Sequence, residues 1–138
     1  MKKVIIYYDS KDSNNKDKII SSLSNKDLIF ESSVIAEEYE NQINKIVENL
    51  KNFDLSIVLS DNYMYFTVKL NKFSNVRCSQ CLSYVEAKYT RDHNNSNILS
   101  LGSNMLGIES ILSICEIYCS KEFSTEEKHI RRVNKIEI

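Results

Sequence analysis

Residues 4–10 of this 138-residue chain, VIIYYDS, give the clearest indication of its fold. Its first five residues are β-branched or aromatic and carry no charge, which is typical of a parallel strand buried on both faces. The run stops at Asp9, so a carboxylate stands directly at the end of the predicted strand. Open α/β sheets bind ligands outside the carboxyl ends of their strands. Asp9 and Ser10 are therefore the first candidates for a functional site.

Outward from this strand, short apolar runs alternate with segments of helical periodicity. Further strands are predicted at residues 28–30, 55–59, 76–78 and 98–101. Helices are predicted between the strands, one of them capped by Ser83 and ending near Arg91, and over residues 107–119 and 125–136. This alternation predicts an α/β fold, a doubly wound five-stranded parallel sheet with helices on both faces in a Rossmann-like three-layer sandwich. The whole chain, 1–138, is expected to form a single domain.

The predicted topology also says where functional side chains should gather. Residues after strands lie at the carboxyl edge of such a sheet. Candidate positions are residues 9–10, 60–65, 92–95 and 102–104.

Composition excludes several classes of function. The formal net charge is -1 and the basic residues are scattered, which gives no electrostatic footprint for nucleic acid or an anionic membrane. No apolar run approaches the roughly 20 residues of a membrane helix, and the first run is too short for a secretory signal. We expect a cytoplasmic protein with neither membrane nor nucleic acid as a partner.

Four cysteines raise the question of a metal site. Cys78 and Cys81 have CxxC spacing, whereas Cys115 and Cys119 lie inside an apolar helical stretch. Structural zinc pairs usually occupy tight turns, so the favoured interpretation is buried, reduced thiols that pack as small hydrophobes. Redox chemistry at Cys78 and Cys81 is the alternative. We expect no bound metal, no disulfide and no cofactor.

Three segments in the second half of the chain resemble a known family. Residues 91–102, RDHNNSNILSLG, resemble the R-x-H-N-x-x-x-x-x-x-x-G segment of ribose-5-phosphate isomerase B. The residues HNNS, followed by LGS, resemble the A subunit of galactose-6-phosphate isomerase more closely still. Residues 128–133, KHIRRV, resemble R-H-x-x-R-V, and residues 71–77, NKFSNVR, resemble N-K-x-x-G-x-R. Residues 4–10 in addition resemble the family's first strand, which leads into Asp-His, so the resemblance spans the whole chain in order.

The resemblance implies an aldose–ketose isomerase that acts on a sugar phosphate. Its chemistry opens the sugar ring and moves a proton between C1 and C2 through a cis-enediolate, which needs acid/base groups and donors for the enediolate oxygens. The resemblance also implies an active site shared between two subunits, with the C-terminal helix packed on a partner subunit.

Several residues receive roles through this resemblance. His93 is the acid/base that opens the ring, and Asn94 holds sugar hydroxyls. Asp9 meets a hydroxyl or the ring oxygen, and Ser10 stands where the family has a histidine. From the residues alone, His93 with Asn94 could instead cap a helix end, and Asp9 could be a cap or turn residue.

Phosphate binding is assigned to the C-terminal helix. Lys128 and Arg132 are four residues apart, so they share one helical face and could bind phosphate. Lysine keeps the charge of the family's arginine but lacks its bidentate geometry. The alternative is a merely exposed helix face. Asn104 stands where many family members have another phosphate-binding arginine.

The catalytic loop departs most from the family. In place of C-G-T-G-x-G, residues 60–65 read SDNYMY, so no glycine remains to cradle the enediolate with backbone N–H groups. Ser60 replaces the cysteine and is a weak base unless it is activated. Asp61 is the carboxylate within reach and would serve as the base after a shift of one residue. Asn62 is a candidate for substrate binding.

Two functions remain open at this point. The favoured hypothesis is a sugar-phosphate isomerase that works as a homodimer or tetramer, or in a heteromer whose paralogous partner has an intact glycine loop. In the heteromer this chain would contribute His93 and Asn94. The alternative is a catalytically inactive paralogue that binds sugar phosphate or has a structural or regulatory role.

Overall fold

The structure, a computed structural model, describes residues 1–36 and 38–137. Five parallel strands form one sheet in the order β2-β1-β3-β5-β4. The strands are β1 (Lys2–Tyr8), β2 (Leu28–Val34), β3 (Leu55–Leu59), β4 (Cys78–Gln80) and β5 (Ile98–Leu101). The predicted five-stranded parallel α/β fold is confirmed.

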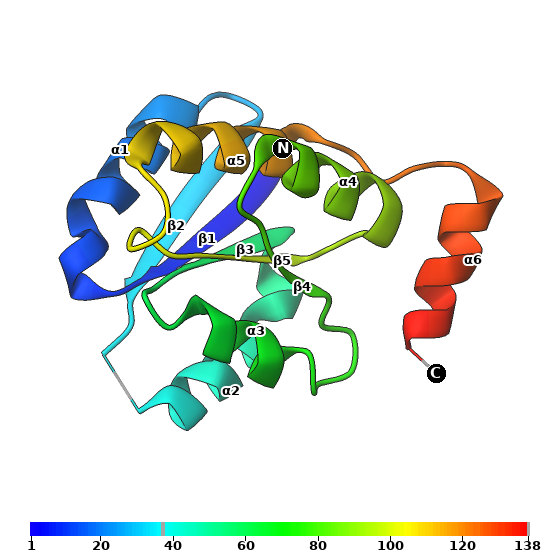
Figure 1. The fold of residues 1–138 in the computed structure, drawn as a ribbon, viewed down its shortest axis with the longest axis horizontal. Coiled ribbons are helices and arrows are strands. Elements are labelled where there is room, and N and C mark those ends of the chain that lie inside the picture. The colour runs from blue at the N-terminus through cyan, green and yellow to red at the C-terminus, as the bar shows by residue number, and fades with distance from the viewer. Residues whose placement is uncertain (37, 138) are drawn as a thin grey trace.

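Helices cover both faces of the sheet, as Figure 1 shows. On one face lie α1 (Ser13–Leu23), α4 (Tyr84–Asn94) and α5 (Ile108–Ser120), and on the other lie α2 (Tyr39–Asn49) and α3 (Tyr63–Leu70). Short 3-10 helices, η1 (Ser10–Asp12) and η2 (Leu50–Asn52), follow β1 and α2. Each face has its own apolar core, so the sheet is sandwiched between two packed helical layers.

The buried strands explain why the sequence folds this way. Every residue of β3 is buried, and residues 4–7 of β1 are at most 5% exposed. Full burial of each aliphatic side chain contributes roughly 1.5–3 kcal/mol, so these two runs dominate the centre of the sheet. β2 is an edge strand and is mostly exposed, which explains its more polar sequence.

The last helix, α6 (Glu127–Ile136), lies at the end of the molecule opposite to α1 (Figure 1). It packs on α4 through its buried residues His129 and Val133. Two apolar residues of α6, Ile130 and Ile136, are 40% and 53% exposed. Among residues 1–36 and 38–137, no helix has the length and apolar character needed to cross a bilayer.

The fourth strand lies two residues later than the predicted 76–78. Asn75 adopts a positive φ of 66° at the end of a turn, and residues 76 and 77 follow it before the strand begins. The Arg77 N–H donates to the Asn97 side chain, and the Asn71 side chain bonds both backbone groups of Cys78. Side-chain hydrogen bonds to the backbone thus delay the start of the strand. Cys78 lies in the strand, as predicted.

The fourth helix continues past the predicted end near Arg91. Ser83 is its N-cap, as predicted, and accepts a hydrogen bond from the Glu86 N–H at 3.2 Å. The helix ends after Asn94 because Asn95 adopts the left-handed conformation with φ 49°. His93 and Asn94 therefore lie in the last helical turn. The C-cap is Asn95, so the interpretation of His93 and Asn94 as helix caps is not supported.

Because the strands are parallel, their carboxyl ends form one edge of the sheet and their amino ends form the opposite edge. Residues after β1, β3 and β5 lie at the carboxyl edge, whereas α4 runs back and ends at the amino edge. There the Asn97 N–H donates to the Arg77 oxygen, and the Asn97 oxygen accepts from the Ser56 N–H at the start of β3. The expectation that residues 92–95 lie at the carboxyl edge is therefore wrong, because they end a helix rather than a strand.

Candidate active site

Asp9 and the loop after β3 meet at the carboxyl edge. β1 and β3 are neighbours in the sheet, although β2 separates them in the sequence. The Asp9 N–H donates to the Leu59 oxygen at 3.0 Å, and Asp9 Oδ2 accepts from the Asp61 N–H at 3.2 Å. Asp9 and Asp61 therefore lie together, at the point where the chain connections leave the sheet in opposite directions, which is where such sheets bind ligands.

Lys11 belongs to the same cluster and was not identified from the sequence. Its Nζ lies 2.7 Å from Asp61 Oδ1 and 3.5 Å from Ser103 Oγ, so it links the loops after β1, β3 and β5. The hydrogen bond to Asp61 raises the pKa of Lys11, with smaller contributions from the charges of Asp12 and Asp9. A lysine two positions after the carboxylate that ends the first strand was the available signal.

The glycine-free segment at residues 60–65 forms a turn that leads directly into α3. Ser60 is buried, and its Oγ accepts from the Asn62 N–H at 3.0 Å. The Asn62 side-chain amide donates to the Tyr39 hydroxyl. No non-glycine residue of this loop has a positive φ, so the loop adopts a different backbone from one that needs glycines. Ser60 stabilises a turn in this arrangement, and Ser10 is exposed at the start of η1.

Tyr63 fills the space between the loops after β3 and β5. It is 3% exposed, and its backbone oxygen accepts a hydrogen bond from Ser100 Oγ at 2.8 Å. A Cβ atom at Gly102 would lie 2.5 Å from Cδ1 of the Tyr63 ring, so glycine is required there by close approach. Within the described residues, the Tyr63 hydroxyl and Asp12 Oδ2 are buried without a hydrogen-bond partner.

A second cluster lies where α4 meets α6. The rings of His93 and His129 stack with centroids 4.1 Å apart and an interplanar angle of 28°. The Tyr89 ring also packs on the His93 ring, with ring centroids 4.9 Å apart. The His93 side chain is 41% exposed, and its Nε2 lies 3.6 Å from Asp92 Oδ2. His129 is buried, and its Nδ1 lies 4.0 Å from Glu126 Oε2.

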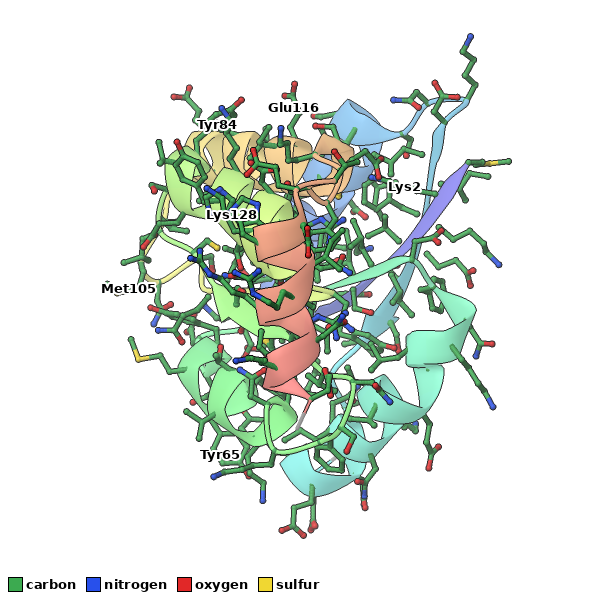
Figure 2. All side chains as sticks on the ribbon, turned by 90° about the vertical axis from the view of Figure 1, so that its right-hand side faces the viewer. Lys2, Tyr65, Tyr84, Met105, Glu116 and Lys128 are labelled. Atoms are coloured by element: carbon green, nitrogen blue, oxygen red, sulfur yellow. The ribbon has the colours of Figure 1, made fainter. Side chains whose placement is uncertain are left out.

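The predicted phosphate ligands belong to this second cluster. Lys128 and Arg132 are exposed on α6, and Figure 2 shows Lys128 in the part of α6 that lies against α4. Lys128 Nζ lies 3.5 Å from Glu126 Oε2, whereas Arg132 has no hydrogen bond or ion pair with the described residues. Asn94 is exposed and donates weakly to Thr90 Oγ1 at 3.4 Å.

The sequence-predicted residues thus form two groups within one chain. The carboxyl-edge cluster contains Asp9, Ser10 and residues 60–62, together with Lys11. The α4–α6 cluster contains His93, Asn94, Lys128 and Arg132. Because the two clusters lie at opposite ends of the strands, one chain does not bring all of these residues into one site.

The cysteines lie outside both clusters. All four are free and buried. Burial raises the pKa of Cys78, Cys81 and Cys119 to about 12, and that of Cys115 well above its ordinary value. Thiolate is the reactive form, so these positions are poor nucleophiles. In the part of the chain described, no group of three histidine, cysteine or carboxylate side chains is placed to hold a metal ion. Absence of metal stays a prediction.

The fold and the two clusters define a parallel α/β protein with acid/base groups at its sheet edge and exposed cations on its last helix. The profile of the Ribose/Galactose Isomerase family matches residues 4–136. The chain belongs to this family.

Individual proteins extend the comparison. YwlF from Bacillus subtilis, provisionally named as a sugar phosphate isomerase, is 31% identical over 83 residues, which are 60% of this chain and 55% of that protein. Ribose-5-phosphate isomerase B from Mycobacterium leprae is 28% identical over 80 residues, which are 58% of this chain and 49% of that protein. The matched segments thus span about half of these two relatives.

Solved structures match over nearly the full length. Ribose 5-phosphate isomerase B from Thermotoga maritima has a TM-score of 0.83 at 27% identity, covering 99% of this chain and 97% of that one. The type B enzyme from Trypanosoma cruzi has a TM-score of 0.88 at 22% identity, covering 99% and 95%, a likeness of fold alone.

Proposed function

We propose that this chain is a subunit of an aldose–ketose isomerase that acts on a sugar phosphate, with each active site completed by a second subunit. The observation that carries the proposal is the separation of the two clusters in a member of the isomerase family. A carboxyl-edge cluster from one subunit and an α4–α6 cluster from its neighbour would together supply acid/base groups and phosphate-binding cations. The exposed Ile130 and Ile136 on α6 support packing of this helix against a neighbouring subunit.

Each group has a chemical task in such a site. His93 exchanges a proton with the ring oxygen, because imidazole is the side chain most often used as a general acid or base. Asn94 and Asp9 hold hydroxyl groups. Lys128 and Arg132 bind the phosphate through charge-assisted hydrogen bonds, and Arg132 needs no internal bond to be broken first. Asp61 is the base for C2, because Ser60 is buried and already accepts a backbone hydrogen bond.

The partner is proposed to be a paralogous subunit with an intact glycine loop. The loop amides of Asp61 and Asn62 are already bonded to Asp9 and Ser60, so they are poorly available to an enediolate. Loss of one oxyanion donor typically costs about 10²–10³ in rate. In a heteromer, the intact loop of the partner would work with His93 and the cations of this chain.

The same hydrogen bonds favour a second candidate function. A chain whose loop N–H groups are hydrogen-bonded to its own side chains could bind sugar phosphate through α6 without converting it. This inactive paralogue would keep the fold and the phosphate site and serve as a sensor or structural subunit.

An assay of the chain alone and mixed with a loop-intact family member separates these functions. Isomerase turnover is measured with ribose and galactose phosphates, and solvent deuterium incorporation next to the carbonyl is followed by NMR. The mixture is expected to turn over on the order of 10 per second, and the chain alone at least about 10²-fold more slowly. Binding without turnover or exchange in either sample would favour the inactive paralogue. Full turnover by the chain alone would contradict the need for a partner.

A further inference from the structure

The carboxyl edge needs a donor for the developing negative charge of an enediolate. The N–H groups of Asp61 and Asn62 donate to Asp9 Oδ2 at 3.2 Å and to Ser60 Oγ at 3.0 Å. An enediolate oxygen would have to displace these internal acceptors. Exchange of one bond for another gives little net stabilisation, so the charge requires a different group in this chain.

We propose that Lys11 is the group that stabilises the enediolate oxygen at the carboxyl edge, acting beside Asp61 as the base. This assignment rests on the proposed isomerase function. Lys11 Nζ lies 2.7 Å from Asp61 Oδ1 and 3.5 Å from Ser103 Oγ, so the ammonium lies at the loop that would hold C1 and C2. Its side chain is 51% exposed, which leaves an approach for a ligand.

The electrostatic surroundings keep this group charged. The hydrogen bond from Lys11 to Asp61 raises the pKa of the lysine, and the charges of Asp12 and Asp9 act in the same direction. Lys11 therefore stays an ammonium at neutral pH. An ammonium can donate to a new oxygen while it keeps a second hydrogen bond, because it carries three donors.

Asp61 and Lys11 together can carry out every proton transfer of the isomerisation. The Asp61 carboxylate removes the C2 proton, the C–H electrons form the C1–C2 double bond, and the carbonyl electrons move to O1. Lys11 donates a hydrogen bond to O1 and then its proton, and its amine takes the proton of the O2 hydroxyl. Asp61 returns the first proton to C1, and O2 becomes the carbonyl oxygen. No external oxidant or reductant is needed.

A purely structural role is the competing explanation. The Lys11–Asp61 ion pair could simply tie the loops after β1 and β3 together. Exposed ion pairs contribute little to stability, and such a role would affect all ligands of the site equally. The two roles therefore differ in which ligand loses affinity.

The test compares two ligands that share a phosphate. A sugar-phosphate hydroxamate imitates the planar, anionic enediolate, whereas the alditol phosphate of the same length lacks that charge. Calorimetry on the full chain, alone and with a loop-intact subunit, measures both affinities. The Lys11 variants are compared in the chain alone, where every carboxyl-edge cluster is this chain's own. Lys11→Met is expected to weaken hydroxamate binding by about tenfold to hundredfold, the effect of one lost charge-assisted hydrogen bond, with alditol phosphate binding changed by less than about twofold.

Two further variants complete the design. Lys11→Arg should retain most of the hydroxamate affinity, because it keeps a cation in place. Lys18→Met is the matched control, since Lys18 is exposed on α1 and its side chain has no hydrogen bond or ion pair with the described residues. Equal losses for both ligands, or no loss, would overturn the role of Lys11 and leave the proposed function standing. Failure of the unsubstituted protein to bind either ligand in both samples would overturn both.

Discussion

The carboxyl-edge cluster and the α4–α6 cluster differ in how much of their hydrogen-bonding capacity the chain itself uses. At the carboxyl edge, Asp9, Ser60 and Asp61 all have internal partners. In the α4–α6 cluster, Arg132 has none among the described residues and His93 is 41% exposed. The first cluster is closed by its own side chains, whereas the second is open to a ligand or a neighbouring subunit.

This difference has an energetic consequence. A ligand at the carboxyl edge must replace existing hydrogen bonds, so its net gain there is small. A phosphate at α6 gains charge-assisted bonds without breaking internal ones, apart from the contact between Lys128 and Glu126. We therefore expect ligand binding to depend mainly on the α4–α6 cluster, and turnover to depend on the glycine loop that a partner subunit supplies.

The largest expected loss of activity follows from removing the His93 imidazole from the α4–α6 cluster. His93→Phe keeps an aromatic ring against His129 but has no titratable nitrogen. In the active mixture we expect kcat/KM to fall by about 10²–10⁴, the usual contribution of general acid–base catalysis. Tyr89→Phe keeps the neighbouring ring and is the control. Unchanged kcat/KM for His93→Phe would mean that the open cluster supplies no acid or base.

The next effect concerns the cations of α6. Arg132→Ala is expected to weaken sugar-phosphate binding by roughly 10–150-fold, which corresponds to about 1.5–3 kcal/mol for one charge-assisted hydrogen bond. Arg131→Ala, on another side of the helix, is the matched control. Calorimetry should also show that affinity falls with added salt. Equal effects of the two substitutions would refute the phosphate site.

Two glycine substitutions test how tightly the side chains pack at the carboxyl edge. Gly102→Ala places a Cβ against the Tyr63 ring, and we expect a loss of about 1–3 kcal/mol in the free energy of unfolding. At Gly107 a Cβ would meet nothing within 4 Å, so Gly107→Ala should cost less than about 1 kcal/mol. Urea titration measures both. Similar losses would mean that Tyr63 does not fill the carboxyl edge tightly.

The smallest effect is expected from thiol reagents on the native protein. Cys115 and Cys119 lie in one apolar core of the protein, and burial raises the pKa of Cys119 to about 12. Because the folded thiols stay protonated, alkylation at neutral pH should be negligible until the chain unfolds. Above the unfolded-state pKa near 8.5, the unfolded chain loses protons first, so stability should fall as pH rises towards 12. Rapid labelling of any cysteine at neutral pH would contradict this.

Much of the fold could be predicted because its signals are local. The uncharged run at residues 4–8 and the helical spacing on either side of it located the strands and helices, and Ser83 was correctly identified as a cap. β4 was misplaced by two residues because its start is set by Asn71 and Asn97, which bond the backbone from distant positions. Such side-chain bonds leave no periodic signal.

The candidate site was predictable in its residue types but not in its arrangement. Motif spacing selected His93, Arg132 and Asp9. The predicted topology placed residues 92–95 at the wrong edge, because they end a helix that returns to the amino edge of the sheet. Motif spacing did not select Lys11, whose importance comes from contacts 50 and more residues away, with Asp61 and Ser103.

The succession of strands and helices along the chain, the family motifs, and the absence of glycine from residues 60–65 can all be read from the sequence. These properties are carried by neighbouring residues and their spacing. The folded chain was needed to show that Lys11 pairs with Asp61, that His93 stacks on His129, and that the two clusters lie at opposite ends of the strands. The physical reason is that these relations arise from parallel strand pairing and helix packing, which join residues far apart in the chain.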